Sequence, residues 1–237
     1  METSLLKQMK TTAGRIIGPR LLQTGRVLGI RGWEPPGVIE IDLHLPATDM
    51  AHWAEIPYIK IMVGDLTFRD YSPAGWDAET STCTIYVDVA HKGPGSTWAT
   101  GLAVNEAIHY LKISSTRQKV RPGKPTVCLG DETSIGHMLA ARQMAPPGSP
   151  FSGAILINDP DHHRLFNEYF RSPLQPILKK GTCGATMLYD WVVQQKYDLK
   201  DTVFLITGNH GMTGRLRKLL RQAGYAADHV AAHGFWS

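Results

Sequence analysis

Two short stretches of the sequence combine residue types that bind phosphate. The first is HKGPGSTWAT at 91–100, in which two glycines, a proline and two hydroxyl residues precede a helix-like run. Unpaired N–H groups and the positive end of the dipole favour an anion at a helix start. These residues therefore allow a binding site for a diphosphate. The alternative is a plain turn in which Ser96 only caps a helix that runs to about Val104.

The second stretch is LTFRDYSPAGWD, which places a cation and an aromatic ring on one predicted strand. Arg69 and Tyr71 are two positions apart and point to the same face, and Ser72 ends the strand. Such a pair can hold a phosphate and stack against a planar ring. The alternative is an exposed arginine on an edge strand beside a packed tyrosine.

The strands and helices that must position these stretches show two different patterns of apolar residues along the sequence. Up to about residue 114, alternating apolar residues and Pro/Gly turns predict short antiparallel strands, arranged as a barrel or sandwich. The predicted strands are 20–30, 37–45, 58–64, 66–72 and 82–90. The polar run 114–125 that follows is interpreted as a linker.

Beyond the polar run, apolar strands alternate with helix-length patterns, which predicts a parallel sheet covered on both faces. The predicted helices are 134–144, 161–170, 185–195 and 213–224. Ligands of such sheets lie beyond the carboxyl ends of the strands. Those ends carry GDET (130–133), Asn158-Asp159 and TGNH (207–210), so we expect a nucleotide there, with ordinary loops and helix caps as the alternative.

The composition of the chain favours some classes of protein and argues against others. The chain of 237 residues is 43% hydrophobic and 19% charged, with a formal charge of +4, which is ordinary for a globular protein. We expect no nucleic-acid binding because Lys and Arg form no dense run, and no membrane span because no long apolar run occurs. The N-terminal residues do not read as a secretory signal. Three widely spaced cysteines fit a reducing cytoplasm.

One pair of neighbouring histidines is a candidate for binding a metal ion. Asp161-His162-His163 has neighbouring histidines that diverge on a helix or a strand, so we expect a solvated helix start instead. No catalytic triad or metal-ligand spacing is evident in the sequence.

The order of the motifs resembles the siderophore-interacting protein family, a branch of the ferredoxin-reductase-like flavoproteins. The matching elements are RDYS (69–72), His91, GPGSTWA (93–99), GDETS (130–134) and an arginine-rich helix followed by HGFWS. The resemblance covers about residues 15–237. It implies an antiparallel β-barrel FAD-binding domain at 1–116 and an α/β parallel-sheet NAD(P)H-binding domain at 117–237.

The resemblance also implies which residues bind each ligand. Flavin-binding residues would be Arg69, Tyr71, Ser72, His91, Gly93, Pro94, Gly95, Ser96, Thr97, Trp98, Thr133, Phe235 and Trp236. Residues for NAD(P)H would be Asp131, Glu132, Ser134, Asn209 and Arg215. Lys60 matches the lysine of a family strand and is the candidate contact for an anionic ferric chelate. No catalytic side chain is expected, since the cofactor carries the redox step.

The implied activity is that of a cytoplasmic flavoprotein oxidoreductase of iron transport. Electrons from NADH, NADPH or ferredoxin would pass through FAD to a ferric siderophore or other ferric chelate and release Fe(II). Two alternatives stay open: a general NAD(P)H:flavin oxidoreductase with another acceptor, and a non-catalytic flavin- or chelate-binding protein. The sequence departs from the family at Pro73-Ala74-Gly75, which lacks a second arginine, and at Asn209-His210, which replaces a carboxylate.

Overall fold

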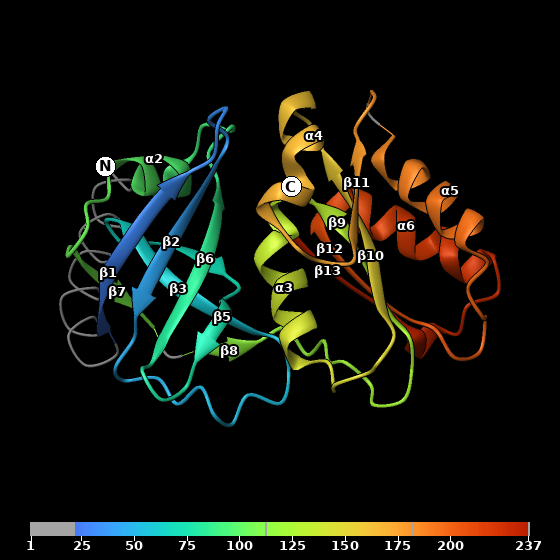
Figure 1. Ribbon diagram of the computed structural model, residues 1–237, viewed down its shortest axis with the longest axis horizontal. Helices are drawn as coiled ribbons and strands as arrows, with labels where there is room; N and C mark the ends of the chain where they lie inside the picture. Colours follow the sequence, from blue (N-terminus) through green and yellow to red (C-terminus); the bar gives the residue numbers. More distant parts are fainter. Residues whose placement is uncertain (1–21, 112, 182, 237) are drawn as a thin grey trace, which may run out of the picture.

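The chain forms two sheets that lie side by side (Figure 1). The computed structural model describes residues 22–111, 113–181 and 183–236. The N-terminal segment on which the prediction about a secretory signal rests lies outside the described residues. Within those residues, no helix has the length and apolar character needed to cross a membrane.

The first sheet is antiparallel, with strand order β4-β3-β7-β1-β2-β6-β5 and with β8 paired to β3. Its strands are β1 Gln23–Gly32, β2 Val38–His44, β3 Pro57–Gly64, β4 Thr67–Tyr71, β5 Ala74–Asp77, β6 Thr82–Asp88, β7 Ala107–Tyr110 and β8 Ser114–Ser115. Only Ser72 and Pro73 separate the two edge strands β4 and β5, so the sheet curls back on itself as a barrel around one apolar core. Helix α2, Pro94–Gly101, follows β6.

The second sheet is parallel throughout, in the order β11-β10-β9-β12-β13. Its strands are β9 Thr126–Asp131, β10 Phe151–Ile157, β11 Leu174–Leu178, β12 Val203–Asn209 and β13 Val230–Trp236. The helices are η1 Glu132–Ser134, α3 Ile135–Met144, α4 Pro160–Tyr169, α5 Gly184–Gln195, α6 His210–Gln222 and η2 Ala227–His229. Buried side chains of α3 and α4 pack on one face of this sheet, and those of α5 and α6 pack on the other.

This architecture confirms the predicted fold class, an antiparallel barrel followed by an α/β parallel sheet. The strand predicted at 37–45 is β2, Val38–His44, in which Ile41 and Leu43 are buried between half-buried polar neighbours. The predicted start of a helix at Ser96 is wrong by two residues. Helix α2 begins at Pro94, whose fixed φ suits the first turn, and it ends at Gly101.

The interpretation of 114–125 as a linker needs correction. The run begins in β8, which pairs with β3, and Gln118 is only 3% exposed. The Gln118 amide nitrogen donates to the carbonyls of Ile206 and Ala231, so this segment is built into the second sheet. Nothing in the sequence indicated that Gln118 is buried, because it lies in a polar run. Its burial depends on hydrogen-bond partners that are far away in the sequence.

Two further contacts join the barrel to helices of the second unit. Trp33 stacks on Tyr169 at 4.2 Å between ring centroids, and Trp76 exchanges two hydrogen bonds with the Gln143 side chain. The expectation of a solvated start of α4 is wrong for His162. That histidine is 3% exposed, meets Trp33 edge-on and contacts the Pro35 carbonyl, although Asp159 caps the helix.

Candidate functional site

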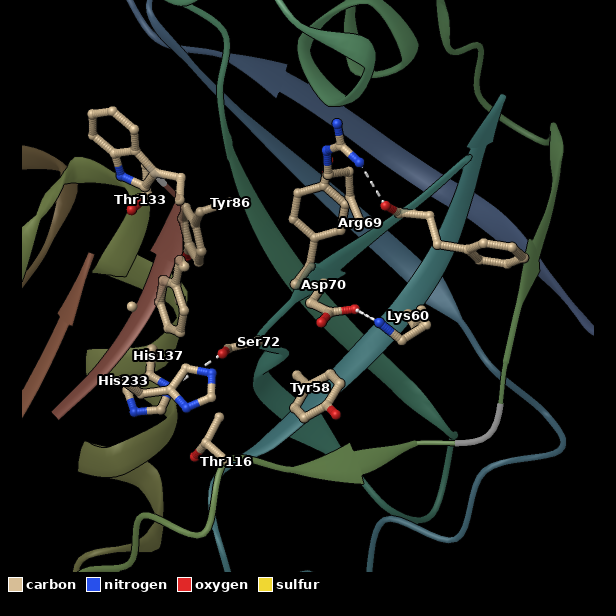
Figure 2. A pocket seen from close by; sticks show the side chains of 16 residues that line it. Tyr58, Lys60, Arg69, Asp70, Ser72, Tyr86, Thr116, Thr133, His137 and His233 are labelled. Atoms are coloured by element: carbon tan, nitrogen blue, oxygen red, sulfur yellow. Dashed lines mark hydrogen bonds and ion pairs between the residues drawn. The ribbon is translucent and has the colours of Figure 1, made fainter. Parts of the chain in front are cut away.

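A cavity of about 500 Å³ lies between the barrel and the second unit (Figure 2). It brings together seven of the predicted site residues: Lys60, Arg69, Tyr71, Ser72, Thr133, Phe235 and Trp236. Nine more line it: Tyr58, Phe68, Asp70, Tyr86, Thr116, Gly136, His137, His233 and Gly234. Strands β3 and β4 form the barrel side, and the start of α3 with the end of β13 forms the opposite side.

On the barrel side, Arg69 and Tyr71 share one face of β4, as their spacing predicts. Both approach Gly95 in the first turn of α2, where a side-chain carbon would lie 2.5 Å from the Tyr71 hydroxyl and 3.5 Å from Arg69 Cγ. Tyr71 also stacks with Trp98 at 5.8 Å. Burial raises the pKa of Tyr71, so it stays a neutral phenol. Glycine at 95 therefore lets the helix start close over the arginine and tyrosine.

The start of α2 lies beside the cavity. Gly93 is its N-cap, and no side chain caps the helix and no acid occupies its first turn in the part of the chain that is described. The alternative that Ser96 caps the helix is wrong: its hydroxyl donates to the Asp88 carbonyl at 3.1 Å. The exposed Thr97 lies one residue further along the helix. The backbone N–H groups of this turn keep the anion-binding character expected of it.

His91 contacts two neighbouring side chains, those of Asp88 and Trp236. Its Nδ1 lies 3.0 Å from a carboxylate oxygen of Asp88, and its ring centroid lies 5.8 Å from that of Trp236. Among the described residues, the walls of the 500 Å³ cavity include neither His91 nor residues 93–98. His91 therefore stands at the rim, next to the indole that closes the cavity.

Lys60 faces the cavity, but it is already paired. Its ammonium lies 2.6 Å from Asp70, directly across from it in the β3–β4 ladder, and 5.8 Å from the Tyr58 ring centroid (Figure 2). The carboxylate offsets the positive charge that an anionic ligand would meet. Asp70 and Tyr58 were not singled out in the sequence, although Tyr58 shares a strand face with Lys60 at i, i+2.

The opposite wall carries two histidines that the sequence did not mark. His137 is buried on α3, and His233 lies on β13; each ring packs on Phe235, at 5.5 and 5.6 Å. Desolvation lowers the pKa of His137 to about 3, with a smaller contribution from His233. His137 falls inside a plain helical pattern, so no sequence signal separates it from a core residue.

A second cavity of about 400 Å³ lies at the carboxyl ends of the parallel strands. Its walls include Asp131, Asn209, Arg215 and Trp236 from the predicted set. The other lining residues are Leu156, Lys179, Gly181, Cys183, Gly184, Ala185, Gly211 and Met212. Strands β9 and β12 are neighbours here although far apart in the chain, which makes this the point where the strand order reverses and where such sheets bind ligands.

Asp131 ties the ends of these two strands together. Its carboxylate accepts from the Asn209 backbone N–H at 2.8 Å and from the Thr133 backbone and hydroxyl at 3.1 and 2.5 Å. Burial raises the pKa of Asp131, and the hydrogen bonds from Thr133 and Asn209 oppose that rise. The Asn209 side chain accepts from Met212 N and so caps α6. Asn209 thus serves as the N-cap of α6.

Glu132 and Ser134 point elsewhere. Glu132 accepts two hydrogen bonds of 2.5 Å from the backbone and side chain of Asn158. Ser134 is fully buried against Gly130, and neither residue is part of the described walls of the two cavities. The geometry therefore gives these two predicted NAD(P)H contacts roles within the loops after β9 and β10.

The Glu132 carboxyl predicts a pH effect on stability. Burial raises its pKa from 4.5 to about 7, against the hydrogen bonds from Asn158 and with smaller contributions from Asp88 and Asp131. Between these pH values the folded state binds more protons than the unfolded state, so this group lowers stability as pH rises from 4.5 to about 7. Glu132→Gln is expected to flatten that part of the stability–pH profile in urea unfolding. If the free energy of unfolding of Glu132→Gln falls with pH as steeply as that of the unsubstituted protein, Glu132 is not the group responsible.

Cys183 was missed in the sequence and lies in the second cavity. It precedes α5, and its sulfur lies 2.8 Å from the Thr186 hydroxyl. This hydrogen bond lowers the pKa of the thiol, and the charge of Arg215 adds to the effect. Lys179 and Arg215 give the same cavity two cations, which suits a phosphate-bearing ligand.

The residues around the first cavity fit a flavin nucleotide. Tyr58, Tyr71, Tyr86, Phe235 and Trp236 offer aromatic surface for a planar ring. Arg69 and the uncapped start of α2 offer an anion site beside it. Among the described residues, no group of three or more His, Cys, Asp or Glu side chains is placed to hold a metal ion.

The fold and the paired cavities define a ferredoxin-reductase-like architecture. Neither a family sequence model nor a curated protein sequence matches the chain. Solved structures do match. The siderophore-interacting protein from Acinetobacter baumannii is 15% identical, with a TM-score of 0.73 over 91% of this chain and 90% of that chain.

Two other structures extend the comparison. The siderophore-interacting protein SipS from Aeromonas hydrophila is 15% identical, with a TM-score of 0.71 over 91% of both chains. Phthalate dioxygenase reductase is also 15% identical, with a TM-score of 0.69 over 90% of this chain and 68% of that one. The chain therefore has the fold of siderophore-interacting proteins and of modular reductases. At this identity the likeness establishes the fold.

Proposed function

We propose that the protein is a flavin-dependent reductase that takes electrons from NAD(P)H and passes them through FAD to a ferric chelate. The observation that carries the proposal is the position of Trp236, which lines both cavities. Ligands held in the two cavities would therefore approach each other at this indole. A bound flavin supplies the chemistry, accepting a hydride and releasing electrons singly.

On this proposal the barrel residues bind and orient the flavin. Arg69 and the first turn of α2, with Gly93, Pro94, Gly95, Ser96 and Thr97, hold the phosphates, and Tyr71 and Trp98 brace that turn. His91 stands at the rim, and Thr133, Phe235 and Trp236 close the cavity from the second unit. We place the boundary between the flavin and nucleotide domains at residues 116 and 117.

The second cavity is assigned to the nicotinamide nucleotide. Arg215 and Lys179 supply positive charge for its phosphates, and Asp131 fixes the backbone of Asn209 at the cavity wall. NADH and NADPH are both compatible with this set of residues. Ferredoxin is a second possible electron donor.

A ferric siderophore is the proposed acceptor, supported by the fold shared with siderophore-interacting proteins and by Lys60 in the cavity wall. A general NAD(P)H:flavin oxidoreductase is the second candidate, favoured by the comparable likeness to phthalate dioxygenase reductase. A non-catalytic protein that holds flavin or ferric chelate is the third candidate, kept because no second arginine follows Tyr71.

Purified protein tests the proposal in two stages. Reconstitution with FAD should give a stoichiometric yellow complex, and anaerobic NADH or NADPH should bleach it. Addition of a ferric chelate should then restore the colour, with Fe(II) trapped by a chromogenic chelator. A protein that cannot be loaded with flavin contradicts both enzymatic candidates, whereas bleaching without reoxidation by any ferric chelate selects the general oxidoreductase.

The pairing of Lys60 with Asp70 predicts opposite effects of two substitutions. Lys60→Ala should lower the rate of reduction of anionic ferric chelates more than that of neutral ones. Asp70→Asn should raise the rate for anionic chelates a few-fold, because the ammonium then meets the chelate without its partner. The ratio of kcat/KM for anionic and neutral chelates measures both effects. Equal changes for the two chelate classes would rule out a role in charge selection.

A further inference from the structure

A chain of three polar side chains runs from the cavity into the second sheet. The Ser72 hydroxyl lies 3.2 Å from His137 Nδ1, and His137 Nε2 lies 2.7 Å from the Gln118 side-chain oxygen. The Gln118 amide nitrogen meets the carbonyls of Ala231 at 2.9 Å and Ile206 at 3.3 Å. Figure 2 shows the first link, with Ser72 on the barrel side and His137 opposite.

The two backbone carbonyls at the far end of this hydrogen-bond network determine where the shared protons of Gln118, His137 and Ser72 lie. Two carbonyl oxygens can only accept, so the Gln118 nitrogen must face them and its oxygen must face His137. His137 Nε2 then carries a proton and donates it to that oxygen. A neutral imidazole has one protonated nitrogen, so Nδ1 is an acceptor and the Ser72 hydroxyl must donate to it.

Burial keeps the imidazole in this neutral form. His137 is 1% exposed, and desolvation lowers its pKa to about 3. Gly136 brings the helix close enough for the contact, since a side-chain carbon at this position would lie 2.6 Å from the Ser72 carbonyl oxygen. The orientation of the Ser72 hydroxyl is therefore set by His137 and, through it, by Gln118.

From this geometry we infer that His137 and Gln118 are positioning residues that hold the Ser72 hydroxyl as a hydrogen-bond acceptor toward the cavity. With its proton committed to His137, the hydroxyl offers only lone pairs to a ligand. It therefore recognises a hydrogen-bond donor of the ligand, such as a ring N–H, and does not bind an unprotonated phosphate or carbonyl oxygen. This inference rests on the proposed function only where the ligand is taken to be a flavin.

For a flavin, the consequence is that the cavity would bind the oxidised and the fully reduced form with different affinities. The isoalloxazine ring gains N–H on reduction, so an acceptor that faces it favours the reduced form. A neutral hydrogen bond of this kind changes the ratio of affinities for the two forms about tenfold, which is about 30 mV for a two-electron couple.

The tautomer can be measured without any ligand. In ligand-free protein labelled with ¹⁵N-histidine, long-range ¹H–¹⁵N correlation at neutral pH should show His137 protonated at Nε2 only. Ser72→Ala should shift the Nδ1 resonance and leave Nε2 protonated. Protonation at Nδ1, or an imidazolium, would overturn the inference. Because no flavin is needed, this measurement decides the orientation even if the protein proves not to bind flavin.

Redox titration of the FAD complex tests the action through Ser72. Ser72→Ala and His137→Phe should each lower the two-electron midpoint potential by about 30 mV, equivalent to about tenfold. The double variant should shift it no further than Ser72→Ala alone, and His137→Asn, which retains an acceptor and a donor, should recover part of the loss. Additive shifts, or an unchanged potential in His137→Phe, would show that His137 does not act through Ser72.

Discussion

Replacement of Gly136 by alanine is expected to remove about 2 kcal/mol from the free energy of unfolding and to weaken flavin binding in the same variant. The added methyl would lie 2.6 Å from the Ser72 carbonyl oxygen and 3.7 Å from the Tyr86 ring. The nearest atom belongs to the backbone, so it cannot rotate away, and overpacking of this kind typically costs 1–3 kcal/mol. Urea unfolding and FAD titration measure the two effects.

Gly214→Ala is the matched control. Gly214 also lies in a helix, α6, but nothing stands within 4 Å of the position its side-chain carbon would take. Alanine there should raise stability by roughly 0.5–1 kcal/mol, because it forms helix better than glycine. If Gly136→Ala raises stability as Gly214→Ala does, helix propensity accounts for the result and the close contact of α3 with Ser72 does not destabilise the variant.

The second large effect is expected at Arg69. Arg69→Ala should weaken FAD binding by about 1.5–3 kcal/mol, the range for a lost charge-assisted hydrogen bond, or roughly tenfold to 150-fold in Kd. The affinity for riboflavin, which has no phosphate, should change much less. Fluorescence titration with FAD and riboflavin separates the loss of a phosphate contact from damage to the ring site.

Arg164→Ala controls for the loss of one positive charge. Arg164 lies on α4, is 66% exposed and pairs only weakly with Asp161 at 3.3 Å. Its replacement should leave both affinities unchanged. An Arg69→Ala protein that binds FAD as tightly as the unsubstituted protein would refute the assignment of Arg69 to the phosphates.

Local patterns predicted the parts of the fold that local physics determines. The alternation in 37–45 and the continuous apolar strands of the second half correspond to β2, β9, β10 and β12. Strand β5, Ala74–Asp77, was missed because proline and glycine in that stretch are typical of a turn. It is a strand because β6 pairs with it and Gln143 hydrogen-bonds the backbone of Trp76. Gln143 lies far from this strand in the sequence, so a local pattern could not indicate its contribution.

The same distinction applies to the site. Arg69 and Tyr71 could be predicted together because a strand of known period presents them on one face, and the strand ends at Asp131 and Asn209 follow from the parallel sheet. Ser72 was predicted only from the resemblance in motif order. His137 and Gln118 could not be predicted. Each is an ordinary polar residue in its own segment, and its role exists only where the barrel, α3 and the second sheet meet.

The contacts between the barrel and helices α3 and α4 have a consequence for kinetics. Trp33 stacks on Tyr169 of α4, and on α3 the Gln143 side chain hydrogen-bonds the backbone of Trp76 and His137 accepts from the Ser72 hydroxyl. These contacts fix α3 and α4 of the described structure against the barrel, so if the proposed function holds, we expect electron transfer without closure of one unit on the other. The reductive step of a single turnover should accordingly keep its rate as glycerol raises the viscosity of the solvent.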